Sequence, residues 1–357
     1  MSDEIDLGVL ADSFSELLRE EWPREKALAF AKAGGIMADD LWVMMAGLGW
    51  PALTVPEEFG GLGLGLDAAA HLHAALGAAV VPSPMLGTTL ASTLLSAAGT
   101  DAQKAAWLPG IADGSVRVAM SQPGDAPLNA DGASVSGIAA DVLDAPAATL
   151  LILNATYGGA ACWILVPVDA SGVSITPQKL SDSTHMLGTV TLANVALDDA
   201  SVIRAADAAA TSDLVLRAAA IALSADALGG GDAVLALTID YMKVREQFNR
   251  LIGSFQALKH RVADHNAALV GSRALLNHAA SLPASHPEAL VYALSAKAHI
   301  TSVVANVARD CVQLHGGVGF TAEYAPHLYL KRAKLNEALF GTQIIILDRV
   351  AALLEAA

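Results

Sequence analysis

The pattern of apolar and polar positions divides the chain into three stretches. Residues 1 to about 115 are predicted to be helical, because apolar side chains recur at helical spacing between runs rich in Gly or Pro. The first helix is expected to begin at Asp12 or Ser13, with Glu16 placed for a capping box. The next is expected to end at Gly34-Gly35.

From about residue 116 to 203 the period becomes that of short strands. Six β-rich runs are separated by turn residues: SVRVAMSQPG, GASVSGIAADV, ATLLILNA, ACWILVPVD, GVSITPQKL and LGTVTLANVAL. This spacing predicts an all-β unit, either a small barrel or a sandwich.

From about residue 204 the helical period returns. One long pattern, RAAAIALSADALGGGDAVLALTIDYMKVREQF, carries a Gly cluster at 229–231, and further helices are predicted over 254–280, 287–315 and 328–355. The fold class is therefore α+β in α–β–α order. Its predicted domains are a helical domain over 1–115, a β-domain over 116–203 and a helical bundle over 204–357.

Composition limits what the protein can be. The 357 residues include 21 Lys and Arg against 36 Asp and Glu, a formal net charge of −15, which argues against nucleic-acid binding. Hydrophobic residues make up 54% of the chain and exclude disorder. The longest stretch without Asp, Glu, Lys or Arg, Ala68–Thr100, contains Pro-Ser-Pro and two His, so we expect no membrane span.

The termini and cysteines indicate the compartment. The N-terminal MSDEIDLGVL is acidic and lacks the basic-then-apolar layout of a signal peptide. Cys162 and Cys311 are too few for a disulfide framework, and neither lies in a CxxC motif. We therefore expect a cytoplasmic protein.

Three segments are candidate ligand-binding segments, and for each a purely structural role is the alternative. VPEEFGGLGLG (55–65) is either a loop between helices or a ligand contact. The segment 241–265 gathers five basic residues, which form either a solvated helix face or a phosphate clamp. They are Lys243, Arg245, Arg250, Lys259 and Arg261.

In DCVQLHGGVGFTAEY (310–324), glycines follow a helix and either cap it or let a ligand approach the backbone. His315 is interpreted as structural rather than as a base, because spacing places no acid beside it. The ten His are scattered without metal-ligand spacing, and P-loop, Rossmann and GxSxG motifs are absent from the sequence.

Together these segments, in order and spacing, make the chain resemble the acyl-CoA dehydrogenases over nearly its whole length. R-x-Q-F followed some 66 residues later by Q-x-x-G-G-x-G-F-T is specific. The segments that carry the resemblance are LGWPALTVPEEFGGLG (48–63), AMSQPG (119–124), YMKVREQFNRLIGSFQALKHRVAD (241–264), CVQLHGGVGFTAEY (311–324) and KLNEALFGTQIIILDRV (334–350).

The resemblance implies a helical N-terminal domain, a middle β-domain and a C-terminal four-helix bundle. It also implies bound FAD and the oxidation of an acyl-CoA thioester to the 2,3-enoyl-CoA, with an electron-transfer flavoprotein as the electron acceptor to test. That chemistry needs a carboxylate base for the α-proton, donors for the thioester oxygen and a flavin placed to accept the β-hydride.

Both family positions for the base lack a carboxylate in this chain. One is the Glu of a Tyr-Glu-Gly-Thr segment, and the matching residues are Leu339-Phe340-Gly341-Thr342, so Phe340 occupies it. The other, about 26 residues before the Arg of R-x-Q-F, falls on Ala219. Glu337, one helical turn before Phe340, is interpreted as a solvated helix residue rather than a substitute base.

The flavin contacts that the resemblance implies divide into two halves, because the family binds FAD across a subunit boundary. In the half that a subunit uses itself, Ser121-Gln122-Pro123 replaces Thr-Glu-Pro and a later Trp-x-x-Thr is missing, which leaves Ser121 and Thr342 as candidate contacts. The half lent to the neighbour is intact. It comprises Arg245, Gln247, Phe248, Gln313, Gly316 and Gly317.

This asymmetry suggests the non-catalytic subunit of a heteromeric (α2β2) acyl-CoA dehydrogenase, as in bacterial steroid and related side-chain degradation. The chain would complete the FAD site of a second subunit that carries the Glu. Two alternatives stay open at this point: a self-sufficient homotetrameric enzyme with a relocated base, and a flavin-free acyl-CoA-binding or structural scaffold.

Overall fold

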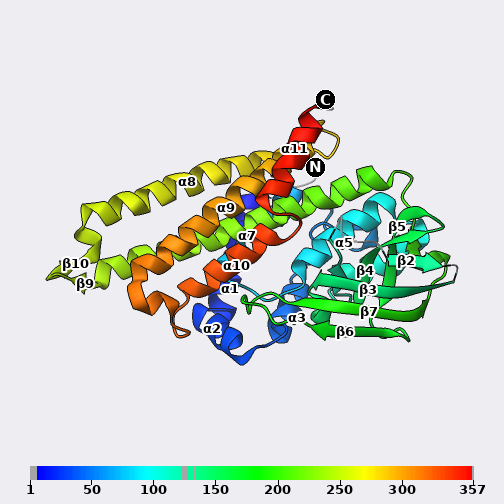
Figure 1. Ribbon diagram of the computed structural model, residues 1–357, viewed down its shortest axis with the longest axis horizontal. Coiled ribbons are helices and arrows are strands. Elements are labelled where there is room, and N and C mark those ends of the chain that lie inside the picture. The colour runs from blue at the N-terminus through cyan, green and yellow to red at the C-terminus, as the bar shows by residue number, and fades with distance from the viewer. Residues whose placement is uncertain (1–5, 123–127, 132, 356–357) are drawn as a thin grey trace. The chain divides into compact units, whose positions relative to one another are not determined.

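A computed structural model describes residues 6–122, 128–131 and 133–355, and it divides into two compact units (Figure 1). Each unit combines segments that are distant in the sequence. Unit 1 comprises Met1–Gly34, Ala70–Val81 and Ala220–Ala357, and unit 2 comprises Gly35–Ala69 and Pro82–Ala219. The order of helices, then strands, then helices confirms the predicted α+β class.

Unit 2 is organised around one eight-stranded sheet with the strand order β6-β7-β3-β1-β4-β5-β8, while β2 pairs with β3 and β4. The strands are β1 Val118–Met120, β2 Leu128–Asp131, β3 Ser134–Leu143, β4 Leu150–Tyr157, β5 Ala160–Pro167, β6 Val173–Pro177, β7 Leu187–Ala196 and β8 Val202–Ile203. All six predicted runs contain a strand, and β2 and β8 are additional.

The sheet mixes parallel and antiparallel pairing. β1 runs parallel to β4, with Val118 opposite Leu150, whereas β4 and β5 form an antiparallel pair over eight residues each. The apolar faces of these strands form one buried cluster of Val, Leu, Ile and Ala side chains. Because few aromatic residues are present, aliphatic packing of Ala, Leu, Val and Ile supplies this core.

Helices complete unit 2: α3 Asp39–Gly47, α5 Met85–Ala98 and α6 Asp101–Ala112, with the short η1 Glu57–Phe59. α5 is buried over most of its length, and Ser92 on it donates from Oγ to the carbonyl oxygen of Thr54 at 2.8 Å. The Gly-rich segment 55–65 is a loop that folds back on itself, since the N–H of Gly63 donates to the Val55 carbonyl oxygen.

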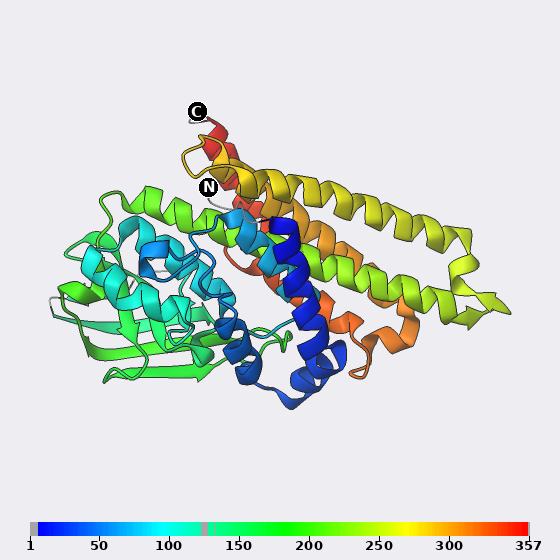
Figure 2. The same ribbon diagram turned by 180° about the vertical axis from the view of Figure 1, so that it is seen from behind.

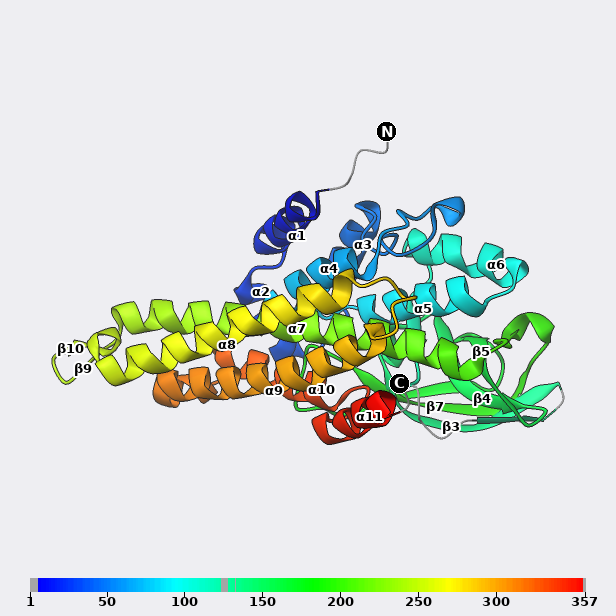
Figure 3. The same cartoon turned by 90° about the horizontal axis from the view of Figure 1, so that it is seen from above.

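Unit 1 contains the long helices α8 Gln256–Ser281, α9 Ala289–His315 and α10 Pro326–Ala338, with α11 Gln343–Glu355 and most of α7 Ala208–Val244. α8, α9 and α10 run beside the later part of α7 in both Figure 1 and Figure 3. α1 Leu7–Glu21, α2 Arg24–Ala33 and most of α4 Leu66–Ala78 also belong to this unit.

Besides the end of α7, which is described with the site, two predicted helix boundaries were wrong. α1 begins at Leu7 rather than near Asp12 or Ser13, because the Asp6 carboxylate accepts the free N–H groups of the first turn. The pattern over 328–355 is two helices, because Phe340 and Gly341 both have positive φ, 55° and 101°, and end α10 before α11 starts.

The Gly cluster at 229–231 does not interrupt α7. A Cβ on Gly229 would lie 1.9 Å from the carbonyl oxygen of Ala74, so the backbones of α7 and α4 are in direct contact there. Two residues further along, Gly231 lies against Leu269 of α8 and Val304 of α9. The cluster therefore marks the point where three helices meet α7.

An ion pair is buried inside unit 1. Arg332 on α10 donates from Nε and Nη2 to Asp226 on α7, at 2.9 and 2.6 Å, and from Nη1 to the Val81 carbonyl oxygen at 3.1 Å. Asn336 adds a bond of 2.6 Å to the same carboxylate. Both carboxylate oxygens of Asp226 accept hydrogen bonds, whereas the buried amide oxygen of Asn336 has no partner among the described residues. The ion pair joins α7, α10 and the end of the 70–81 segment.

Two helical segments, Ala208–Val244 and Ala289–Phe320, are long and apolar enough to cross a membrane by length and composition alone. In their most apolar windows, 83% and 56% of the residues are buried inside the protein. Packing against other helices accounts for this composition, as expected of core helices.

Seen from behind (Figure 2), α1 and α2 lie over the bundle of unit 1. A groove of about 420 Å³ runs between them and the Ala-rich faces of α4 and α7.

Candidate functional site

The periodicity predicted that the R-x-Q-F segment continues the helix α7, but it does not. α7 ends at Val244, and the chain forms a two-stranded hairpin of β9 Glu246–Gln247 and β10 Arg250–Leu251. Phe248 and Asn249 at its tip both have positive φ, 54° and 62°, as a two-residue type I′ turn requires. This turn, which helical spacing cannot reveal, replaces the predicted helix.

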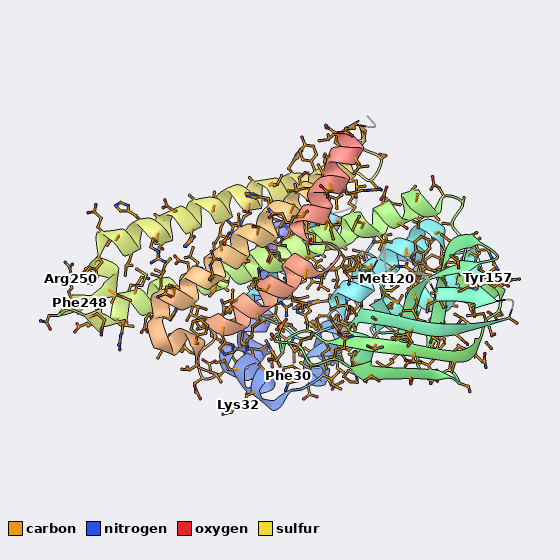
Figure 4. The ribbon with its side chains drawn as sticks, viewed as in Figure 1. Phe30, Lys32, Met120, Tyr157, Phe248 and Arg250 are labelled. Atoms are coloured by element: carbon orange, nitrogen blue, oxygen red, sulfur yellow. The ribbon has the colours of Figure 1, made fainter. Side chains whose placement is uncertain are left out.

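A small apolar cluster holds the base of the hairpin. Met242, Ile252 and Leu314 are buried there, with Tyr241 and Phe255 packed at the edge. The guanidinium of Arg250 lies 3.8 Å from the centre of the Phe255 ring, a cation–π contact. In Figure 4, Phe248 and Arg250 lie at the hairpin end of the helical unit.

The hairpin forms one wall of a pocket of about 720 Å³ within unit 1. The start of α8 forms a second wall, and the end of α9 with η5 Gly316–Phe320 forms a third. The pocket brings together all six residues predicted to form the lent half of a flavin site: Arg245, Gln247, Phe248, Gln313, Gly316 and Gly317.

The pocket offers a positive charge that is not neutralised. The Arg245 side chain is exposed and makes no ion pair with any residue that the structure describes. Gln313 is also exposed, whereas the Gln247 amide donates to the neighbouring Glu246 carbonyl oxygen at 2.7 Å. An unpaired guanidinium beside amide groups is suited to phosphate oxygens.

Gly317 leaves space that the chain itself does not use. A Cβ added there would meet no atom within 4 Å, and its φ is not in the left-handed region. The fold therefore does not require glycine at this position. A ligand that approaches the backbone closely does supply a reason for it.

His315 contributes an acceptor to the pocket wall. Its ring is buried and stacks on Tyr241 with centroids 4.5 Å apart, and Nδ1 lies 2.8 Å from the Cys311 carbonyl oxygen. Burial lowers the pKa of His315, so we assign a neutral ring that donates from Nδ1. Nε2 then carries a buried lone pair, which has no partner in the described chain.

Arg261 on α8 is a second guanidinium in the lining, and the flavin contacts that the resemblance implies do not include it. Its Nε donates to Oδ2 of Asp310 on α9 at 3.1 Å, and Nη2 pairs with the other oxygen of that carboxylate. His265, one turn further along α8, lies 2.7 Å from the same Oδ2. Sequence reasoning noted the charge of Arg261 but could not show its partners.

The residue that the resemblance places at the position of the family base, Phe340, has a buried aromatic ring. Phe340 is 5% exposed, in the turn between α10 and α11. Glu337 precedes it on α10, is 23% exposed at its side chain and pairs with Lys334. The side chain is therefore ion-paired, as well as more buried than the solvated residue that the sequence predicted.

The turn at Phe340 is held by a buried lysine that sequence reasoning missed. Lys297 on α9 is 0% exposed, and its Nζ donates to the carbonyl oxygens of Gly341 at 2.6 Å and Glu337 at 3.4 Å. Burial lowers the pKa of Lys297 to about 8, an effect that the charge of Glu337 partly offsets.

The second position for a base also lacks an acid. Ala219 is fully buried, and the first acid after it on α7 is Asp226, whose carboxylate accepts bonds from Arg332 and Asn336. A carboxylate fixed by an ion pair in this way is poorly suited to accept a substrate proton. Within the described chain, no cluster of three or more His, Cys, Asp or Glu could hold a metal ion.

The two remaining predicted flavin contacts lie in different units. Ser121 in unit 2 is buried, and its Oγ accepts the N–H of Asn154 at 2.8 Å. Pro123 and Gly124 of the AMSQPG segment lie outside the described residues. Thr342 in unit 1 is exposed, and its carbonyl oxygen accepts the N–H of Ile346 at the start of α11. Their flavin contacts stay predictions.

A helical bundle that presents arginine, amides and glycines around an open pocket defines a candidate binding site for a phosphate-bearing ligand. Residues 7–115 match the N-terminal domain of acyl-CoA dehydrogenases and residues 210–354 match their C-terminal domain. The chain belongs to the acyl-CoA dehydrogenase family, whose members are oxidoreductases that act on acyl-CoA.

Relatives cover nearly the whole chain. It is 33% identical to acyl-CoA dehydrogenase IpdE2 of Mycobacterium tuberculosis over 314 residues, which is 87% of this chain and 86% of the relative. The structure of a steroid acyl-CoA dehydrogenase, Tcur3481-Tcur3483, is similar with a TM-score of 0.86 and 29% identity over 98% of both chains. The ChsE4-ChsE5 complex of M. tuberculosis has the same fold, with a TM-score of 0.87 and 24% identity over 100% of both chains.

Proposed function

We propose that this chain is the Glu-less subunit of a heteromeric acyl-CoA dehydrogenase, and that it completes the FAD site of a catalytic subunit. One observation carries the proposal. The pocket of Arg245, Gln313 and Gly317 keeps its ligand-binding groups, whereas the position of the base holds the buried ring of Phe340. The chain has kept the part of a flavin site that serves a neighbour and has lost the group that removes a proton.

The rim of the pocket supports a partner subunit. Four large apolar side chains around it are exposed, among them Phe248 at 87% and Phe320 at 73%, together with Val244 and Val318. Apolar groups gathered around a polar pocket are typical of a surface that another protein covers.

The residues present fit the adenosine diphosphate part of FAD. Arg245 would bind the diphosphate, Gly317 would let it approach the backbone, and the free lone pair of His315 Nε2 would suit an amine donor such as that of adenine. When bound, FAD supplies the acceptor for the substrate hydride. The role of this chain is to bind and orient the cofactor, while the partner supplies the carboxylate.

The relatives support the heteromeric form of the proposal. Tcur3481-Tcur3483 and ChsE4-ChsE5 are each named as pairs, and the first is described as a steroid acyl-CoA dehydrogenase. We therefore propose an acyl-CoA substrate, with steroid side-chain thioesters as the first class to test. An electron-transfer flavoprotein is proposed as the electron acceptor, and the cytoplasm as the location.

Co-expression with a neighbouring acyl-CoA dehydrogenase gene tests the proposal. We expect a complex of two chains that holds FAD, bleaches with acyl-CoA and loses flavin when this chain carries Arg245→Gln. The matched control is Arg273→Gln, an exposed arginine on α8 that lines no part of the pocket. A homotetramer of this chain alone that binds stoichiometric FAD and reduces it with acyl-CoA would overturn the proposal.

The same preparations separate the two alternatives. A self-sufficient enzyme with a relocated base would lose its activity in Glu337→Gln, whereas the heteromer would keep it. A flavin-free scaffold would remain colourless, alone or with a partner, and would bind acyl-CoA without a flavin absorbance.

A further inference from the structure

An ion pair beside the pocket is not among the flavin contacts that the resemblance implies. Arg261 lines the pocket. The carboxylate of Asp310, on α9, binds the Nε and Nη2 edge of its guanidinium. In this arrangement the Nη1 donors have no partner among the residues described. They are free to meet a ligand on the other edge of the same planar group.

His265 is a second partner of the Asp310 carboxylate. Its Nε2 lies 2.7 Å from Asp310 Oδ2, so the carboxylate is bound on two sides and cannot easily rotate away from Arg261. Burial, and next the charge of Arg261, lower the pKa of His265, which makes it a neutral donor to Asp310. The carboxylate is therefore a fixed anchor for the arginine.

A link between helices is the simpler explanation of such a pair, and the same chain offers a comparison. Arg273, twelve residues further along α8, pairs with Asp232 of α7, and the arginines of both pairs are nearly equally exposed, at 43% and 44%. Of these two arginines, only Arg261 lines the pocket. Linking helices explains both pairs, but it does not explain why one arginine faces the pocket.

We propose that Arg261 is a second phosphate-binding residue of this pocket, and that Asp310 is the residue that positions it. The proposal rests on the function proposed above. A dinucleotide diphosphate carries two negative charges, and Arg245 supplies one unpaired positive charge. Arg261 adds charge-assisted donors for the second phosphate, while Asp310 keeps the guanidinium in place before the ligand arrives.

The test measures FAD binding by the protein as purified, together with any subunit that co-purifies. The flavin is removed, and FAD is added back while its fluorescence is followed. Losing one charge-assisted bond predicts about a ten- to hundredfold rise in Kd for Arg261→Gln. Arg273→Gln should bind FAD like the wild type, and thermal melting verifies that both variants fold.

The outcomes separate this proposal from the function on which it rests. If Arg245→Gln weakens FAD binding and Arg261→Gln does not, the second phosphate contact is refuted and the lent flavin site stands. If neither variant changes the Kd, both proposals fail. If Arg261→Gln and Arg273→Gln weaken binding equally, the effect is not local and this proposal fails.

Asp310 has its own test. Asp310→Asn should raise the Kd for FAD several-fold, Asp310→Glu should restore part of the affinity, and Asp232→Asn, the matched change at the other pair, should leave it unchanged. Tighter FAD binding by Asp310→Asn would mean that the carboxylate competes with phosphate for Arg261, and it would overturn the positioning role.

Discussion

Lys297 provides a strict test of how the turn at Phe340 is held. The side chain is fully buried, and the structure gives it two backbone carbonyl partners, on Gly341 and Glu337. Lys297→Met keeps an unbranched side chain but removes the charge and the donor. We expect this change to alter how the stability of the protein depends on pH, and not only its value at one pH.

The magnitude follows from the pKa. A fall from 10.5 to about 8 corresponds to about 3 kcal/mol between the charged and neutral forms of the buried amine. Because the folded pKa lies below the unfolded one, the unfolded chain holds the proton more tightly between about pH 8 and pH 10.5. The contribution of this lysine to the free energy of unfolding therefore rises across that window and is constant on either side.

The assay is thermal melting of wild type and Lys297→Met from pH 7 to 11. The lost hydrogen bonds lower the Tm of the variant by the same amount at every pH. The loss of the titrating amine makes the difference in Tm between wild type and variant increase by about 4 °C from pH 8 to pH 10.5, if the whole chain unfolds together. Lys259→Met, which removes an exposed lysine of α8, should show no such trend. A constant difference between wild type and Lys297→Met over this range would refute the reasoning.

Three further predictions follow, two of which compare matched substitutions. Asp226→Asn should cost about 3–5 kcal/mol in unfolding experiments because it removes the carboxylate that neutralises the buried guanidinium of Arg332, whereas Asp232→Asn at a half-exposed pair should cost under about 1 kcal/mol. Gly317→Val should raise the Kd for FAD with an unchanged Tm, and a normal Kd would remove the argument for backbone approach. Gly229→Ala should lower the Tm strongly through its clash with α4, whereas Gly271→Ala, exposed on α8 with open space around it, should raise it slightly.

Periodicity was sufficient for most of the fold. Apolar spacing located the long helices, and alternation with turn residues located six strands, because burial on one face leaves a direct trace in the sequence. Apart from the start of α1, the errors fell where non-glycine residues adopt positive φ, at Phe248, Asn249 and Phe340. Tertiary contacts impose these conformations, and neither propensity nor spacing records them.

The site was predictable to the extent that it follows motifs. R-x-Q-F and Q-x-x-G-G meet in one pocket, as the resemblance implied. The anchor of Arg261 on Asp310 joins residues 49 positions apart, and that of Lys297 ends on backbone carbonyls, so neither has a signature in side-chain spacing. The free lone pair of His315 likewise follows only from which of its nitrogen atoms is already bonded.

The buried arginine of α10 also bears on how the chain is synthesised. Arg332 holds the carbonyl oxygen of Val81, and Tyr329 holds that of Ala78, both across 251 positions of sequence. The end of the 70–81 segment emerges from the ribosome about 10–50 seconds before these partners, at about 5–20 residues per second. During that interval its contacts with α10 cannot form, and α7, whose backbone meets this segment at Gly77 and Ala74, is the earlier helix against which it can pack.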